Sequence, residues 1–393
     1  MSTASQRSAA RQTALLAGIL LIAANLRAPF TGLPPLLGSI RADLGLGTTA
    51  AGALTTLPLL AFALVSPFGA LLARKYGLER ALFGALVLIA LGIALRSAGA
   101  PWNLYAGTAI IGMGIAIGNV LLPSLVKRNF PRAVASLTGA YALAMGVAAA
   151  LGSAAVVPLA RAWGWHGALA AFFVLPLAAL AVWSTQLNAH VSPASNRTAS
   201  AHAGKVWRSA LAWQVTLFLG LNSTIYYVAI GWLPTILIDS GLSPEYAGSL
   251  HGILQLATAV PGLVLGPILL RLRDQRLPAA VVAGFSVIAL AGLLALPRFA
   301  LAWSILFGLG TGAGIILGLS FIGLRTRNAH QAASLSGMSQ CIGYLLAAAG
   351  PMAMGRLHDT LGGWGVPLGI CTVLAIVAMF MGWLAGRARH IEA

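Results

Sequence analysis

Charged side chains are scarce in this chain. Asp, Glu, Lys and Arg together make up 8% of its 393 residues, and only 7 residues are acidic. Soluble domains carry about a quarter charged residues. The hydrophobic fraction is 59%, which is more apolar surface than a water-soluble fold of this size can bury. The composition therefore excludes an ordinary soluble domain and predicts a protein whose surplus apolar surface faces lipid.

Cysteines and reactive clusters are almost absent as well. The 2 cysteines, Cys341 and Cys371, both lie in apolar segments and give neither a disulfide framework nor a metal-ligand spacing. The sequence contains no paired carboxylates, no nucleophile–base pattern and no Walker lysine motif. We therefore expect no catalytic residues, no metal, no cofactor and no direct use of ATP. The chain is not expected to be an enzyme.

Long apolar runs fill most of the chain. A membrane-spanning helix needs about 20 mostly apolar residues, and charged or Pro/Gly-rich breaks divide the sequence into about twelve such runs. The predicted fold is therefore all-α and integral to the membrane. The predicted spans are 13–36, 50–73, 79–98, 102–126, 134–160, 166–187, 210–238, 244–270, 278–296, 300–324, 331–355 and 363–386.

The net charge of +17 reflects topology. Basic residues form short clusters between the apolar runs and line no amphipathic face, so nucleic acid is not an expected partner. With both termini inside, 18 Lys and Arg lie on the inner side, 5 lie outside and Arg27 lies within the first span, which accounts for all 24. This excess predicts a multi-pass inner-membrane protein with both termini in the cytoplasm. The outer residues are Arg41, Arg96, Arg161, Arg298 and Arg356.

The polar stretch 188–209 divides the chain into two similar parts. It predicts an N-terminal six-helix bundle at 1–187, a cytoplasmic linker and a C-terminal six-helix bundle at 210–393. Both parts contain a basic cluster followed by a small-residue motif, Lys127-Arg128-Asn129 with Ser136-Leu-Thr-Gly139 and Arg325-Thr-Arg-Asn328 with Ser334-Leu-Ser-Gly337. Six spans per copy preserve orientation, so the repeats are parallel. Such an architecture predicts a solute cavity between the halves near mid-membrane.

Several motifs resemble the major facilitator superfamily. Its basic, glycine-marked loop matches residues 69–80, Gly-Ala-Leu-Leu-Ala-Arg-Lys-Tyr-Gly-Leu-Glu-Arg, although Ala73 stands where the superfamily usually has an acid. Asn25-Leu-Arg27, residues 118–123 (Gly-Asn-Val-Leu-Leu-Pro) and residues 249–252 (Ser-Leu-His-Gly) resemble its cyanate permease and 2-nitroimidazole transporter branch. The resemblance implies two six-helix halves and alternating-access transport of a small polar, anionic or heteroaromatic solute.

Arg27 is the first candidate for a substrate-binding residue. It lies near the middle of the first span, where an arginine costs at least ~2.5–3.5 kcal/mol to insert. No Asp or Glu lies in the middle of a predicted span, so Arg27 has no intramembrane carboxylate partner. Its guanidinium either binds the solute with its planar fork of donors or contacts helix-break carbonyls near Pro29. We favour solute binding.

His251 and Gln255 are four residues apart and lie on one face of the eighth span. His251 either donates to a nitro or carboxylate oxygen, carries a coupling proton, or forms a structural hydrogen bond between helices. Asn222 and Tyr226 share a face of the seventh span in the same way, and the tyrosine ring is suited to stacking a flat heteroaromatic ring. The sequence leaves both pairs open between solute binding and helix packing.

Polar residues of three other spans complete the candidate site. Each lines the predicted cavity or forms an interhelical hydrogen bond, which is a common role for amides in membranes. These residues are Asn119, Tyr141, Gln340 and Tyr344.

The function that these features predict is a secondary active or facilitative transporter with Arg27 as substrate anchor. Its expected partners are a small-molecule solute, the lipid bilayer and, if His251 titrates, protons; no protein partner is required. The alternatives are a membrane-embedded channel and a membrane enzyme acting on a small or lipid substrate. A channel is less compatible with a two-fold internal repeat, and an enzyme lacks a reactive cluster.

Overall fold

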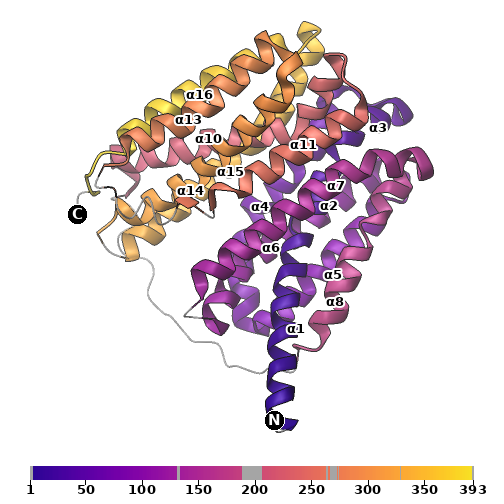
Figure 1. Cartoon of the computed structure of the whole chain (residues 1–393), viewed down its shortest axis with the longest axis vertical. Helices are drawn as coiled ribbons and strands as arrows, with labels where there is room; N and C mark the ends of the chain where they lie inside the picture. The colour runs from indigo at the N-terminus through magenta and orange to yellow at the C-terminus, as the bar shows by residue number, and fades with distance from the viewer. Residues whose placement is uncertain are drawn as a thin grey trace.

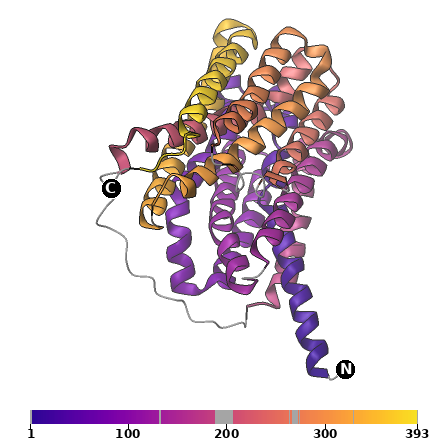
Figure 2. The ribbon, with the colours of Figure 1, turned by 60° about the vertical axis from the view of Figure 1, so that its left-hand side comes forward.

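The computed structural model describes residues 3–130, 133–187, 206–262, 264–265, 272, 274–327 and 329–391, and every regular element in these ranges is a helix. Figures 1 and 2 show long helices of the first half, drawn in indigo to magenta, beside those of the second half, drawn in orange to yellow. The first half contains α1 (Thr3–Asn25), α2 (Ala28–Thr31), η1 (Pro34–Leu36), α3 (Leu37–Leu44), α4 (Thr48–Tyr76), α5 (Leu78–Arg96), α6 (Pro101–Asn129), α7 (Val134–Ala171) and α8 (Val174–Ser184). The second half contains α10 (Ala210–Asp239), α11 (Pro244–Ala259), α13 (Arg276–Ala295), η2 (Pro297–Phe299), α14 (Ala300–Leu324), α15 (Ala329–Leu361) and α16 (Gly365–Ala385).

Nine helical stretches in the described part of the chain are long and apolar enough to cross a membrane. One of them, Ser136–Ser184, contains both the fifth and the sixth predicted spans, and it bends at Gly164, whose φ of +68° lies outside the helical region. The eighth and eleventh predicted spans correspond to α11 and α15, which are helical but are not among the nine. The all-α membrane fold is confirmed, and the elements are consistent with twelve spans. The predicted linker at 188–209 lies largely outside the described residues.

Glycine allows two helices of the first half to touch through their backbones. A Cβ added to Gly107 on α6 would lie 2.4 Å from the Arg96 backbone nitrogen and 2.6 Å from the Gly92 carbonyl oxygen on α5. A Cβ added to Gly92 would in turn lie 2.7 Å from the Gly107 oxygen. Small residues drive helix association in membranes by permitting this approach. At the level of Gly92 and Gly107, α5 and α6 therefore touch backbone to backbone.

The two halves meet where α4 packs against α15 and where α7 packs against α11. We call this interface the seam. The Asp359 carboxylate on α15 accepts hydrogen bonds from the backbone N–H and hydroxyl of Thr49 on α4, at 2.9 and 3.0 Å. Arg161 on α7 forms an ion pair with Glu245 on α11. These two contacts lie at one end of the helices. We call the other end of the molecule, where α8 ends and α10 begins, the open face.

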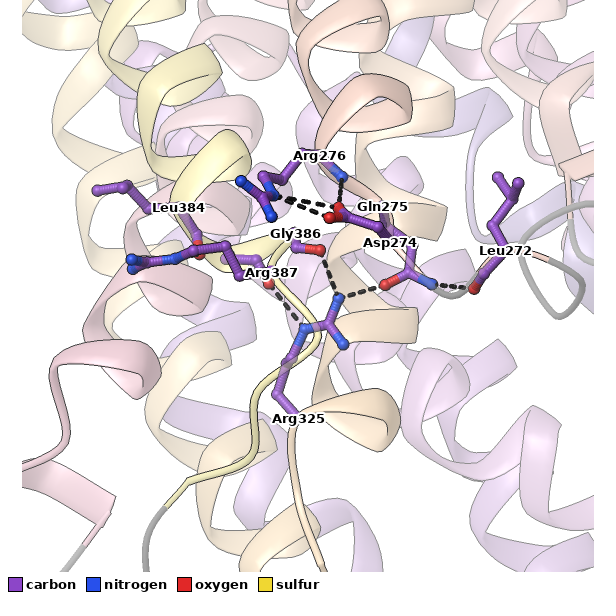
Figure 3. Close-up of polar contacts among 9 residues, drawn as sticks. Leu272, Asp274, Gln275, Arg276, Arg325, Leu384, Gly386 and Arg387 are labelled. Carbon is purple, nitrogen blue, oxygen red and sulfur yellow. Dashed lines mark hydrogen bonds and ion pairs between the residues drawn. The ribbon is translucent and has the colours of Figure 1, made fainter.

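At the open face, the buried side chain of Arg325 fastens the end of α16 to α14 (Figure 3). Its guanidinium donates to the carbonyls of Ala385 and Gly386 at 2.7 and 3.0 Å and to the Gln275 side chain. Next to it, hydrogen bonds from the backbone and side chain of Arg276 hold the pKa of Asp274 below its ordinary value. The hydrogen bonds of the Arg325 side chain all go to neutral oxygens, whereas the neighbouring Arg276 and Asp274 form an ion pair.

Replacing Arg325 with methionine (Arg325→Met) is expected to lower the free energy of unfolding by about 3 kcal/mol. The substitution leaves two carbonyls of the α16 end without their donor, and a hydrogen bond to a charged group contributes about 1.5–3 kcal/mol. Thermal unfolding of the purified protein measures the effect. Arg327→Met is the matched control, because Arg327 lies two residues away with an exposed side chain. Equal melting temperatures of the two variants would contradict the role given to Arg325.

Candidate functional site

The first predicted span is broken where Arg27 lies. α1 ends at Asn25, a turn follows, and α2 begins at Ala28 with Arg27 as its N-cap residue at φ −128° and ψ −51°. Pro29, in the first turn of α2, has no backbone N–H with which to continue the helical ladder. Buried Arg96 on α5 donates to the Pro29 carbonyl at 2.7 Å. Arg27 therefore extends from a non-helical backbone that a neighbouring helix holds in place.

The guanidinium of Arg27 lies over the ring of Tyr226, with Cζ 5.6 Å from the ring centroid. Tyr226 belongs to α10, so a cation from the first half meets an aromatic ring from the second. No ion pair within the described part of the chain includes Arg27. A cation–π contact uses the face of the guanidinium, while its N–H groups lie within reach of the Tyr226 and Tyr227 hydroxyls. This is the arrangement expected of an anchor for an anionic or electron-rich group.

Two cavities adjoin Arg27, and a third adjoins one of them. The first has a volume of about 420 Å³ and is lined on α7 and α14 largely by small or flexible residues such as Gly139, Ala142, Met145 and Gly312. The second, of about 340 Å³, also contains Arg27 and shares Met145 with the first. The third, of about 300 Å³, shares Asn119 and Tyr344 with the second. Together they form a trough between the halves.

The trough opens toward the open face. Its lining includes Thr138 near the start of α7, Gln340 near the start of α15 and Ser66 in the second half of α4. The contacts across the seam close its other end. At this level Gly52 of α4 packs against the second half, where an added Cβ would lie 3.0 Å from the Pro351 oxygen and 3.2 Å from the Trp232 ring. Among the described residues, the trough therefore extends toward the open face, and the seam contacts lie beyond its other end.

Most of the residues predicted from the sequence line this trough. The first cavity contains Arg27, Tyr226 and Gln255; the second contains Arg27, Asn119, Tyr141 and Tyr344; the third contains Asn119, Gln340 and Tyr344. Their roles in solute binding stay predictions.

Two predicted residues lie elsewhere. Asn222 does not line any of the three cavities; its side-chain amide donates to the Thr311 carbonyl at 3.0 Å and joins α10 to α14. His251 is fully buried, and its Nδ1 lies 3.0 Å from the Ser153 hydroxyl of α7. Both positions agree with the packing alternative that the sequence left open.

Tyr227 was not among the predicted site residues, yet it lines the second cavity and makes an edge contact with Phe30 at a ring-centroid distance of 6.2 Å. Consecutive residues of a helix point about 100° apart, so Tyr226 and Tyr227 reach different cavities from one helix. Phe62, which contacts Tyr344 at 5.8 Å, was also not selected. Apolar aromatic residues give no signal in a sequence that is apolar throughout.

Comparisons with known proteins agree with this geometry. Residues 15–351 match the Major Facilitator Superfamily. The chain is 54% identical over 393 residues, covering 100% of both chains, to the 2-nitroimidazole transporter of Escherichia coli (strain K12). It is 28% identical to the cyanate transport protein CynX of the same organism, over 89% of this chain and 91% of that one. A solved structure of a bacterial homolog of the human lysosomal transporter Spinster, in an inward-facing and occupied conformation, has the same fold, with a TM-score of 0.75, 14% identity and coverage of 95% and 96%.

These relatives are transporters, which confirms the predicted class and gives no support to the alternative of a membrane enzyme. The family and its branch, inferred above from short motifs, are confirmed over nearly the whole chain. The sequence, the fold and these relatives thus lead to one conclusion: the chain belongs to the Major Facilitator Superfamily and is a multi-pass membrane transporter of small molecules.

Proposed function

We propose that this transporter carries a small planar solute with an anionic or electron-rich polar group, of the 2-nitroimidazole or cyanate kind, and that Arg27 anchors that group. The observation that carries the proposal is the position of Arg27 in the trough, over Tyr226 and without an acidic partner among the described residues. Its neighbours Tyr226, Tyr227 and Tyr344 offer aromatic surface to a flat ring. Relatives named for 2-nitroimidazole and cyanate support the same chemistry.

The open face is proposed to lie in the cytoplasm of a cell whose inner membrane holds the protein. The excess of Lys and Arg on the predicted inner side supports this orientation. The conformation is then one in which the trough opens inward and the seam is closed outward. Alternation would require 1–187 and 210–393 to rock as units about the trough while 188–209 connects them.

Facilitated, exchange-type or potential-driven transport is favoured over a proton relay. Within the described residues, no Asp or Glu lines the three cavities, and His251, the predicted titrating group, lies outside them. Binding of solute can change the balance between the two states only through contacts that differ between them. Initial rates in proteoliposomes with and without an imposed pH gradient distinguish these energy sources.

The test of the proposed function is ligand stabilisation of the purified protein. A ligand that binds only the folded state adds about 2.7 kcal/mol of stability at a concentration of 100 Kd, so 2-nitroimidazole or cyanate is expected to raise the melting temperature in a saturable way. A neutral disaccharide, which lacks the group that Arg27 is proposed to bind, is the control. If neither probe raises the melting temperature at any soluble concentration, this substrate assignment fails.

A further inference from the structure

The segment that carries Arg27 is tied to the seam by a chain of hydrogen bonds. Thr31, the last residue of α2, is fully buried and donates from Oγ1 to the Arg27 carbonyl at 3.2 Å. Its own carbonyl accepts a hydrogen bond from the Ser153 hydroxyl of α7 at 3.0 Å. A displacement of the backbone at Arg27 therefore acts directly on Ser153.

Ser153 in turn contacts the other half of the protein. Its Oγ lies 3.0 Å from Nδ1 of His251 on α11. A serine hydroxyl has one proton, and Ser153 uses it on the Thr31 carbonyl, which can only accept. In the tautomer with a hydrogen on Nδ1, His251 donates it to Ser153 Oγ. In that tautomer the donors run in one direction, from His251 through Ser153 to Thr31.

This contact lies where the backbones of α7 and α11 approach each other. A Cβ added to Gly252 would lie 2.7 Å from the Ala150 oxygen, and one added to Gly248 would lie 3.0 Å from the Ser153 oxygen. The two helices cannot separate at this level without breaking the bond between His251 and Ser153. The bond is thus a contact of the closed seam.

A second set of contacts joins α11 to Arg27, one helical turn after His251. Gln255, one turn after His251, accepts a hydrogen bond from the Tyr226 hydroxyl at 3.0 Å, and the Tyr226 ring lies under the Arg27 guanidinium. The stretch from His251 to Gln255 therefore contacts the surroundings of Arg27 twice, once through the backbone of α2 and once through an aromatic ring.

We propose that His251 is a coupling residue: its hydrogen bond to Ser153 transmits the position of the Arg27 segment to the seam, so that occupation of the trough changes the stability of the closed seam. His251 does not touch the solute. The inference extends the proposed function, because it takes Arg27 to be the residue that responds to solute. The bond exists only while α7 and α11 are in contact, so it is present when the seam is closed and absent when the seam is separated. Coupling requires a contact that differs between the two states in this way.

The experiment compares two substitutions of His251. His251→Asn keeps an amide N–H close to the position of Nδ1, whereas His251→Leu has a similar bulk and no donor. Two exposed residues near the Arg161–Glu245 pair are replaced by spin-labelled cysteines, Trp163→Cys on α7 and Tyr246→Cys on α11. The distance between the two labels reports whether the seam is closed. The background lacks Cys341 and Cys371. Affinity for 2-nitroimidazole comes from melting-temperature titration, and turnover comes from proteoliposomes.

In His251→Leu we expect the solute-free distance distribution to shift toward the separated seam and saturated turnover to fall about tenfold, while the dissociation constant changes less than threefold. His251→Asn should restore both the distribution and the turnover to within threefold of the parent. Ser153→Ala should reproduce the effect of His251→Leu, and the double variant should add nothing to it, because residues that act through one contact are not additive.

Three outcomes overturn the inference. A dissociation constant weakened tenfold or more with unchanged saturated turnover makes His251 a solute ligand. An unchanged distance distribution in both His251→Leu and Ser153→Ala makes the contact ordinary packing. Equal defects in His251→Leu and His251→Asn show that the Nδ1 donor has no part in the effect. The distance measurement needs no solute, so the inference can fail while the substrate assignment stands, and the reverse.

Discussion

Arg27→Ala is expected to abolish transport while the protein still inserts and folds. The guanidinium is the one strongly charged group among the described residues that line the trough. Two charge-assisted hydrogen bonds to an anionic or nitro group together contribute about 3 kcal/mol or more. A loss of that size weakens binding by at least about 100-fold. The seam contacts of Asp359 and Glu245 do not involve Arg27, so the fold should persist. Initial uptake rates and melting-temperature titration with 2-nitroimidazole measure the two effects.

Two further variants define the cause of this loss. Arg27→Lys keeps the charge but removes the planar fork and its stacking on Tyr226, so it should recover only part of the affinity. Arg298→Ala removes an arginine of η2 that lies outside the trough, so it should transport normally. Normal uptake kinetics in a folded Arg27→Ala protein are incompatible with the proposed anchor.

Gly107→Ala is expected to prevent stable folding of the first half. The added methyl would lie 2.4 Å from the Arg96 nitrogen and 2.7 Å from its Cα, and backbone atoms cannot rotate away as the end of a side chain can. Overpacking costs typically 1–3 kcal/mol and occasionally more, and here two helices would have to separate along their length. The yield of monodisperse protein in detergent and its melting temperature give the result.

Gly84→Ala is the matched control on α5, because an added Cβ at Gly84 has no atom within 4 Å. Alanine is favoured over glycine in a helix by up to about 1 kcal/mol, so this variant should be as stable as the parent or slightly more so. Gly107→Ala protein with the melting temperature of Gly84→Ala would refute the packing role of Gly107.

The fold could be predicted from the sequence because its cause is compositional. Apolar runs of spanning length specify helices in lipid whatever their neighbours are, and loop charges constrain orientation. Arg27 could be singled out for the same reason, since an unpaired charge inside such a run is costly wherever the run packs. The other predicted residues that line the trough could be found because they are polar side chains within apolar runs.

Pairs of residues on different helices could not be predicted. The partner of His251 is Ser153, which lies 98 positions away, and the partner of Asn222 is a carbonyl of α14. Backbone carbonyls occur at every residue, so the sequence does not indicate which one a side chain will find. Counting charges likewise places Arg96 on the outer side and Arg325 on the inner side of the membrane, and it does not reveal that both side chains are buried against backbone carbonyls.

The backbone contact between α5 and α6 has a mechanical consequence. Where two helices touch through glycine, the contact has no side chain that can change rotamer, so α5 and α6 should move as one unit. The first predicted span is the opposite, because its helix stops at Asn25 and continues only as the short elements α2 and η1, and Arg96 attaches α2 to the end of α5. A change at Arg27 is therefore expected to bend the first span at its breaks rather than to separate α5 from α6.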